Sequence, residues 1–303
     1  MVNVTLVGTS GMTPLPDRHL SSALINHNGV GFLIDCGEGT QVSLRKIGAS
    51  LKKIDYVLLT HYHTDHIGGL AGLFASMANN EKDNTLTIVG PKGLNRVVEA
   101  SKRLVSKLPF VIKTIEIVNE TATLQLAGLS VTPFLVDHKI ACFGYKLELH
   151  RDGKCDPKKA AANNVPMELW SSLQQNQIVH YEGRVLTKDL IMSGSRKGIK
   201  VVYTTDTRPC RNITENAKDA DLFICEGMYG EEEQSINAEK NYHMTMHEAV
   251  SLAASCGVKE VLLTHYSPSI VNPDKYLNEL RYTFSRVNMG HDGLTRELLF
   301  EEA

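Results

Sequence analysis

His61-Tyr62-His63-Thr64-Asp65-His66 follows directly after the apolar run Ile54 to Leu59, which has the composition of a buried strand. Histidine and aspartate are ligands that catalytic divalent metals prefer. A loop at the end of a strand holds such ligands on a rigid scaffold and still leaves them open to substrate. A polar turn whose histidines only cap or fill is the alternative, but so dense a cluster at one strand end favours a metal site.

The composition is that of a globular enzyme. The chain has 303 residues, of which 42% are hydrophobic and 22% are charged, enough for one large domain or two fused halves. The sequence contains neither an apolar run of the ~20 residues that span a bilayer nor a secretory signal, so no membrane partner is expected. Six scattered cysteines without a C-x-x-C pair indicate reduced thiols in a cytoplasmic protein. The net charge of −2 means that a polyanionic substrate must be attracted by a local patch or by metal ions.

Strand and helix signals alternate in the first half of the chain, and strands dominate the start of the second half. We predict strands at 2–7, 22–25, 30–34, 54–60, 86–89, 115–118, 123–126, 129–135, 143–149, 199–204, 222–225 and 261–264. We predict helices at 41–47, 70–77, 94–104, 246–255 and 276–287. This order fits two αβ halves, each with a mixed sheet covered by helices, better than a barrel.

Three further candidate ligands, His138, Asp206 and His265, each lie just past an apolar strand signal. Strand ends are where a parallel or mixed sheet presents its functional loops. Each residue alone could equally be a capping aspartate or a satisfied loop histidine. Together with the histidine-rich segment they supply seven nitrogen and oxygen ligands, a number that fits two metals sharing one bridging carboxylate.

This ligand set resembles that of the metallo-β-lactamase superfamily, and finer features resemble the short form of its ribonuclease Z branch, whose members trim the 3′ end of precursor tRNA. The resemblance spans nearly the whole chain. The segments that carry the likeness to the branch are Leu6-Val7-Gly8-Thr9-Ser10-Gly11 with Pro14, Arg18, Ser21 and Ser22, then Leu33-Ile34-Asp35-Cys36-Gly37-Glu38-Gly39-Thr40-Gln41, His243-Met244-Thr245-Met246-His247-Glu248-Ala249 and Leu263-Thr264-His265.

The resemblance implies an α/β fold, the four-layer αβ/βα sandwich of the metallo-β-lactamases, as one hydrolase domain over residues 1–303. It also implies two divalent metal ions per subunit, with zinc as the default and manganese as the alternative. One ion would be held by His61, His63 and His138. The other would be held by Asp65, His66 and His265, with Asp206 bridging the two. Asp65 would orient the attacking water or serve as its general base.

His243 would, by the same resemblance, donate a proton or hydrogen bond to the leaving or a non-bridging oxygen. Thr245 and Glu248 have capping-box spacing, which places His243 just outside a helix N-terminus, where anions gather. An exposed loop histidine is the alternative, and His247 is expected to face solvent. Glu226 resembles the acidic residue that hydrogen-bonds the catalytic histidine, although an ordinary strand-end carboxylate is equally compatible with the sequence.

Segment 151–199 is a candidate substrate-binding arm inserted in the domain, because it is polar and has only short apolar pieces. The arm of the branch carries a Gly-Pro pair, whereas this chain has Val165-Pro166-Met167-Glu168-Leu169-Trp170 at the corresponding place. A second departure is Thr205, which precedes Asp206 where the family usually has glycine. The basic residues of the segment, which could contact phosphates or form a solvated face, are Arg151, Lys154, Lys158, Lys159, Arg184, Lys188, Arg196 and Lys197.

The leading prediction is a two-metal phosphodiesterase that removes the 3′ trailer from pre-tRNA, cutting after the discriminator base and leaving a 3′-hydroxyl. A phosphodiesterase of the same fold acting on small or cyclic phosphodiesters, or on other RNA 3′ ends, is the alternative within the enzymes. A metal-containing RNA-binding module without activity is the alternative outside them. The resemblance also implies a homodimer in which the arm of one subunit serves the site of the other.

Overall fold

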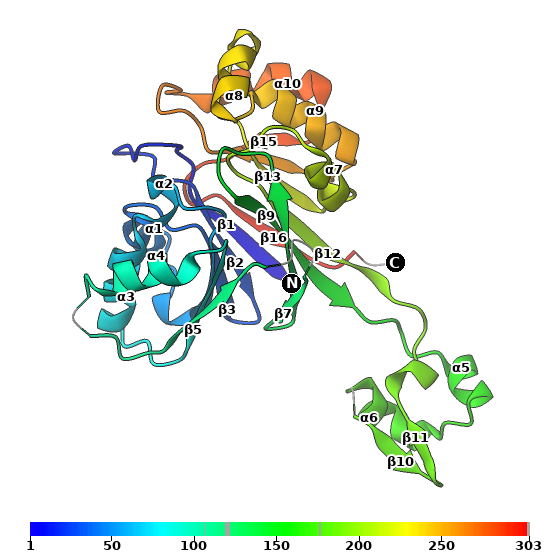
Figure 1. Ribbon diagram of the computed structural model, residues 1–303. Helices are drawn as coiled ribbons and strands as arrows, with labels where there is room; N and C mark the ends of the chain where they lie inside the picture. Colours follow the sequence, from blue (N-terminus) through cyan, green and yellow to red (C-terminus); the bar gives the residue numbers. More distant parts are fainter. Residues whose placement is uncertain (106, 119–121, 176, 302–303) are drawn as a thin grey trace. The chain divides into compact units, whose positions relative to one another are not determined.

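The computed structural model describes residues 1–105, 107–118, 122–175 and 177–301. The chain forms two compact units, one made of Met1–Glu148 and Lys200–Leu299, the other of Leu149–Ile199 and Phe300–Ala303. The first unit contains both large sheets, apart from the end of one strand and the start of another, and every residue of the candidate site described below (Figure 1).

The first sheet has seven strands and is covered by helices on its outer face. Its order is β16 (Thr295–Leu298), β1 (Val2–Gly8), β2 (Ser22–His27), β3 (Val30–Ile34), β4 (Ile54–Leu58), β5 (Leu86–Gly90) and β6 (Ile112–Glu116). The covering helices are α1 (Thr40–Lys46), α3 (Leu70–Asn79) and α4 (Leu94–Lys102). The strands from β3 to β6 are parallel, so their carboxyl ends meet at one edge.

The second sheet also has seven strands. Its order is β15 (Val287–Met289), β14 (Val261–Thr264), β13 (Leu222–Glu226), β12 (Arg196–Tyr203), β9 (Cys142–Arg151), β8 (Leu129–Val136) and β7 (Leu124–Leu126). The helices α7 (Arg211–Ala217), α9 (Met246–Cys256) and α10 (Leu277–Thr283) pack on it through a large apolar cluster. The strands from β12 to β15 are parallel, which again gathers their carboxyl ends at one edge.

The two sheets face each other with helices outside both, which confirms the predicted four-layer αβ/βα sandwich (Figure 1). Hydrogen bonds join the sheets beside the metal centre. The Tyr145 hydroxyl donates to the carbonyl of Leu59 at 2.6 Å, and the Phe143 N–H donates to the carbonyl of Thr60 at 3.0 Å. Because Leu59 and Thr60 lead directly into the histidine-rich segment, these bonds fix where that segment leaves β4.

Most predicted elements lie where the sequence pattern placed them, but the C-terminal region is different. The helix predicted at 276–287 is wrong at both ends: Tyr276 belongs to a 3₁₀ turn, α10 ends at Thr283, and Val287 begins β15. Strand β6 begins three residues earlier than predicted, at Ile112, and ends two residues earlier, at Glu116. The chain also contains α8 (Ser235–Asn241) and the 3₁₀ helices Leu51–Lys53, Met167–Leu169, Lys188–Leu190, Glu232–Gln234 and Pro273–Tyr276.

The second unit is a small folded body in its own right. It contains α5 (Pro157–Ala162), α6 (Trp170–Gln174) and the hairpin of β10 (Val179–Tyr181) with β11 (Arg184–Leu186). Asp156 caps α5 by accepting hydrogen bonds from two backbone N–H groups. The unit encloses a core of its own, made of Ala160, Val165, Leu173, Leu186 and Ile191.

The described cysteines are all free thiols, as the sequence predicts. In the described ranges, the helices are too short or too polar to cross a lipid bilayer.

Candidate metal centre

All seven predicted ligands meet at the carboxyl-end edges of the two sheets. His61 and His63 lie on the loop after β4, and Asp65 and His66 lie on the short helix α2 (Thr64–Ile67) that follows. The other three come from the loops after β8, β12 and β14 and are His138, Asp206 and His265. Strand-end loops from both halves of the sandwich therefore build one site.

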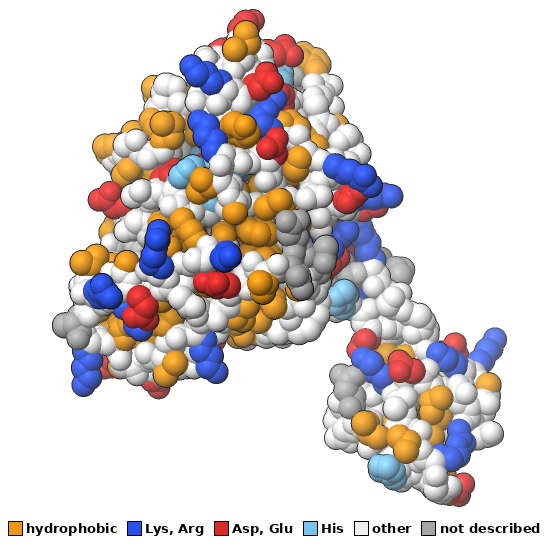
Figure 2. All heavy atoms as spheres, in the orientation of Figure 1, with side chains coloured by type: hydrophobic (Ala, Val, Ile, Leu, Met, Phe, Trp, Pro, Cys, Tyr) orange, Lys and Arg blue, Asp and Glu red, His pale blue; other side chains and the backbone are white. Residues whose placement is uncertain are grey.

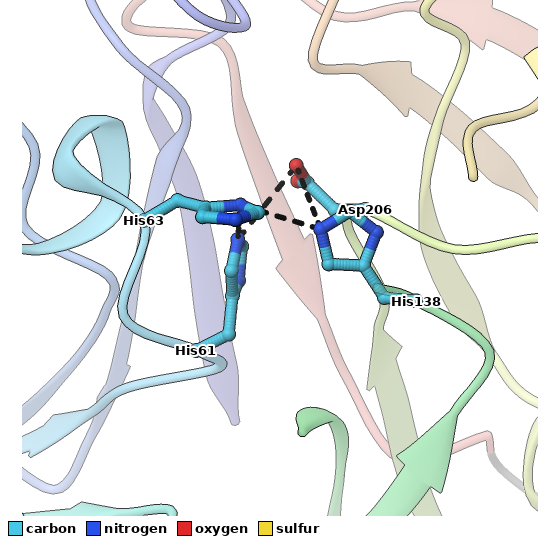
Figure 3. A group of neighbouring side chains, drawn as sticks. All are labelled: His61, His63, His138 and Asp206. Carbon is cyan, nitrogen blue, oxygen red and sulfur yellow. Dashed lines mark hydrogen bonds and ion pairs between the residues drawn. The ribbon is translucent and has the colours of Figure 1, made fainter. Parts of the chain in front are cut away.

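One group of candidate ligands comprises His61, His63, His138 and Asp206, each offering one donor atom within 4.8 Å of the others. Nε2 of His61 lies 3.0 Å from Nδ1 of His63, and Nε2 of His138 lies 3.3 Å from the same atom. The four side chains point toward one another from three loops, of which one carries both His61 and His63 (Figure 3). This spacing is that of ligands arranged around a common centre.

A second group comprises Asp65, His66, His265 and, again, Asp206. Oδ1 of Asp206 lies 3.0 Å from Nε2 of His265 and 3.2 Å from Nε2 of His66. Oδ2 of Asp65 lies 3.4 Å from Nε2 of His66. Asp206 therefore belongs to both groups, since Oδ1 faces His66 and His265 while Oδ2 lies 3.7 Å from Nε2 of His61.

The donor atoms of this site fit divalent cations. Nε2 of His66 and both ring nitrogens of His265 are buried and, although carboxylate oxygens lie near, make no well-aligned hydrogen bond among the described residues, a costly state that a bound metal would relieve. Burial lowers the pKa of His61, and burial lowers that of His138 to about 4, so both rings are neutral and able to ligate at pH 7. Burial also opposes protonation of His66, yet Asp206 and Asp35 raise its pKa, so the site attracts positive charge.

Asp35, which was not predicted as a site residue, supports the candidate ligand His66. Its fully buried carboxylate accepts hydrogen bonds from Nδ1 of His66 at 2.8 Å and from the Thr60 N–H at 2.8 Å. These bonds orient the His66 ring so that Nε2 faces Asp206. The available signal was positional, since Asp35 directly follows the apolar strand β3, just as the other site residues follow theirs.

The loops that carry the central ligands are held in restricted conformations. His265 has a φ of +55°, a left-handed conformation that is uncommon outside glycine and that often accompanies function. Gly11 lies against this ring, because a Cβ atom there would come within 2.9 Å of Cε1 of His265. Thr205, the residue before Asp206, donates from its hydroxyl to Oδ1 of Asp206 at 2.8 Å.

His243 lies beside the two groups of ligands and is held by Glu226. Its Nδ1 lies 3.1 Å from Oε2 of Glu226, and its Nε2 lies 3.9 Å from Oδ2 of Asp206. Burial disfavours the charged ring, but the Glu226 carboxylate outweighs this effect and raises the pKa of His243 to about 9. The predicted capping box of Thr245 and Glu248 is present at the start of α9. Nε2 of His243 therefore faces Asp206, and the Glu226 carboxylate favours the protonated form of the ring.

His247 and the predicted phosphate-binding residues lie outside the groups of candidate metal ligands. His247 does not simply face solvent, because its Nε2 lies 3.0 Å from Oε1 of Glu279 and its side chain is only 17% exposed. The predicted phosphate-binding residues Arg151, Lys154, Lys158, Lys159 and Arg184 all belong to the second unit.

Comparison with known proteins places the chain among metal-dependent nucleases. Residues 2–104 match the family model of the anti-Pycsar protein Apyc1, and residues 173–266 match that of the β-lactamase superfamily domain. The chain is 45% identical to ribonuclease Z of Agathobacter rectalis over 302 residues, which cover 100% of both proteins. It is 46% identical to ribonuclease Z of Lachnoclostridium phytofermentans, over 100% of this chain and 99% of that protein. Human tRNase Z, short form (ELAC1), has a similar fold, with a TM-score of 0.71 at 21% identity over 98% of this chain and 100% of that structure.

Proposed function

The chain belongs to the ribonuclease Z family of metal-dependent endoribonucleases that process the 3′ ends of tRNA, and we propose that the His/Asp cluster is the two-metal centre at which it cleaves pre-tRNA. The observation that carries this proposal is the position of Asp206, which belongs to both groups of candidate ligands. His61, His63 and His138 would hold one ion, and Asp65, His66 and His265 the other.

Bound divalent ions would supply an activated water nucleophile and neutralise charge on the phosphate oxygens. Asp65 would orient the attacking water and accept its proton. Burial would raise the pKa of Asp65, but the nearby His265 and His66 rings lower it, which favours the ionised carboxylate that can accept a proton. The Met12 N–H donates to Oδ2 of Asp65 at 3.0 Å and limits its rotation.

His243 donates a proton to the leaving oxygen. Cleavage after the discriminator base breaks the bond between phosphorus and the ribose 3′ oxygen, which leaves as a hydroxyl. An alkoxide is a poor leaving group, so a proton donor at this oxygen accelerates the reaction. Glu226 keeps the His243 ring charged and oriented through its contact with Nδ1, which leaves Nε2 for the substrate.

The finer features of this proposal follow from the donor chemistry and from the likeness to the branch. Zinc is the ion favoured by a centre that is mostly imidazole, with manganese as the alternative. The substrate is pre-tRNA, from which the enzyme removes the 3′ trailer. The working form is a homodimer, which the likeness to the branch supports. The enzyme acts in the cytoplasm, which the free thiols support.

The second unit is the proposed substrate-binding arm. Figure 2 shows Lys and Arg side chains on the face of this unit that is in view. Several of its cations are used internally: Nζ of Lys159 donates to the Met192 carbonyl and Nη2 of Arg184 donates to the Asn163 carbonyl. Lys154 and Lys158 are exposed and are the best placed to contact RNA phosphates.

Deletion of residues 152–195, with a short Gly-Ser linker in their place, tests this role. The unit has its own core, so its removal leaves the packing of the two large sheets in place. We expect KM for pre-tRNA to rise about tenfold or more, which corresponds to ~1.4 kcal/mol of lost binding. Steady-state hydrolysis of a nitrophenyl phosphodiester, which is too small to need the arm, should change by less than about twofold.

A charge-matched pair of variants refines the test. Lys154→Ala/Lys158→Ala should weaken pre-tRNA binding. The affinity of this variant should also depend less on salt concentration than that of wild type. Lys53→Ala/Lys113→Ala is the control and should behave as wild type. It removes two exposed lysines near the amino ends of β4 and β6, whereas the candidate ligands lie at the carboxyl ends of the strands. Equal losses on both substrates after the deletion would mean that the second unit serves stability and not RNA binding.

A further inference from the structure

Arg208 contacts more than one part of the metal centre, although the proposed chemistry does not use its side chain. It lies two residues after Asp206 in the same loop. Its backbone N–H donates to the carbonyl of Asp137 at 2.9 Å, next to the candidate ligand His138. Its guanidinium reaches in the other direction, to the segment that leads into α9.

The guanidinium binds His243 and Glu248 together. Nη1 donates to the backbone carbonyl of His243 and to Oε2 of Glu248, the latter at 2.9 Å, and Nη2 donates to Oε1 of Glu248. Such a two-pronged contact fixes both the position and the plane of the guanidinium. Glu248 is itself fixed, because its Oε2 accepts the Thr245 N–H at 2.9 Å in the capping box.

His243 is thus held at two points. Glu226 binds the ring at Nδ1, and Arg208 binds the backbone carbonyl. The short loop that carries Arg208 also fixes Glu226 at the end of β13, because the Thr207 N–H donates to Oε1 of Glu226 at 2.6 Å. The residue before His243 is Tyr242, whose φ of +61° is rare for a bulky side chain, so this backbone needs outside contacts to keep its course.

We propose that Arg208 is a positioning residue that directs Nε2 of His243 at the leaving oxygen of the substrate. The inference rests on the proposed role of His243 as proton donor and adds a residue that does not touch the substrate. Both terminal nitrogens of Arg208 are occupied by His243 and Glu248, and its side chain is 19% exposed. Loss of Arg208 therefore releases the backbone of His243 while the metal ligands and Glu226 remain.

The test compares two substrates that differ in their need for a proton donor. The ribose 3′ oxygen of pre-tRNA leaves poorly without a proton, whereas nitrophenolate leaves readily as an anion. We expect Arg208→Gln to lower kcat on pre-tRNA on the order of 10- to 100-fold, part of the 10²–10⁴-fold that acid–base groups contribute. KM for pre-tRNA and kcat on a nitrophenyl phosphodiester should both stay within about threefold of wild type.

Matched variants separate positioning from general stability. Arg208→Lys keeps a charged donor for the His243 carbonyl but loses the two-pronged contact with Glu248, so it should recover part of the lost kcat. The same variant tests the inference if Arg208→Gln does not fold. Arg211→Gln removes another arginine three residues later, which is exposed and pairs with Glu215 at 2.6 Å on α7, and should match wild type. His243→Ala should show the same dependence on the leaving group, and adding Arg208→Gln to it should cause little further loss.

Three results would overturn the inference. Equal losses on both substrates would make Arg208 a structural residue, and a rise in KM for pre-tRNA at unchanged kcat would make it an RNA contact. Either result leaves the role of His243 intact, provided that His243→Ala still discriminates between the leaving groups. If His243→Ala itself shows no such discrimination, the proposed proton donor is wrong and the inference about Arg208 falls with it.

Discussion

Replacement of Asp65 by alanine is expected to lower kcat/KM for pre-tRNA by about 10³-fold or more, which corresponds to ~4 kcal/mol of transition-state stabilisation. The change removes a candidate metal ligand and the proposed proton acceptor in one step. The hydrogen bond from the Met12 N–H is lost as well, which frees the loop after β1. Single-turnover cleavage assays over a range of subsaturating enzyme concentrations measure the effect.

Binding of pre-tRNA should survive the same substitution within about twofold, because the proposed arm lies in the other unit of the chain. A filter-binding or anisotropy titration with the intact precursor checks this. Asp83→Ala, which removes an exposed carboxylate in the turn before β5, is the control and should cleave as wild type. Turnover retained by Asp65→Ala would refute the role assigned to this side chain.

Replacement of Asp206 by alanine should have an equally large effect through a different cause. Its carboxylate lies 3.0 Å from Nε2 of His265 and 3.7 Å from Nε2 of His61, so its removal takes one ligand from each proposed metal position. We expect the metal content of the purified protein to fall from about two ions per chain to about one or fewer, since both positions lose their shared ligand. Elemental analysis by mass spectrometry after desalting measures it.

The stability of the variant provides a second readout that does not depend on activity. A ligand at 100 times its Kd stabilises the protein that binds it by about 2.7 kcal/mol, so added zinc should raise the Tm of the metal-stripped wild type. The same addition should raise the Tm of Asp206→Ala much less, whereas Asp83→Ala should respond as wild type. Full metal content in Asp206→Ala would show that this residue does not bridge the ions.

Much of the site could be predicted from the sequence because its ligands follow strong strand signals. The apolar run before His61, and those before His138, Asp206 and His265, are continuous enough to place four strand ends. In a sandwich with parallel strands, those ends lie at common edges, so residues far apart in sequence meet. The ligand set is thus readable from local patterns together with one rule of topology.

Other parts of the structure depend on contacts that no local pattern reveals. Strand β16 is a polar, half-exposed segment that exists because it pairs with β1, and Val2 pairs with Leu298 at nearly the opposite end of the chain. Val287 continues an apparently helical pattern, but pairing with Val261 of β14 draws it into the second sheet. The long-range partner decides the local conformation in both places.

The supporting residues Asp35 and Arg208 show the same limit within the site. In the sequence, Asp35 looks like an ordinary strand-end carboxylate and Arg208 like an ordinary loop cation. The roles that we assign to them rest on hydrogen bonds to His66 and to the His243 carbonyl, which depend on side-chain geometry. The second unit is a similar case, since its short helices and hairpin are stabilised by a small core whose members lie far apart in the segment.

Mapping the cut in a pre-tRNA that lacks an encoded CCA end tests the central claim most directly. The purified protein, supplied with zinc or manganese, is incubated with an end-labelled precursor, and both product ends are characterised. We predict one metal-dependent cut directly after the discriminator base, with a 3′-hydroxyl on the tRNA and a 5′-phosphate on the trailer. An uncut precursor, cuts spread along the RNA, or cyclic phosphate ends formed without metal would contradict the account.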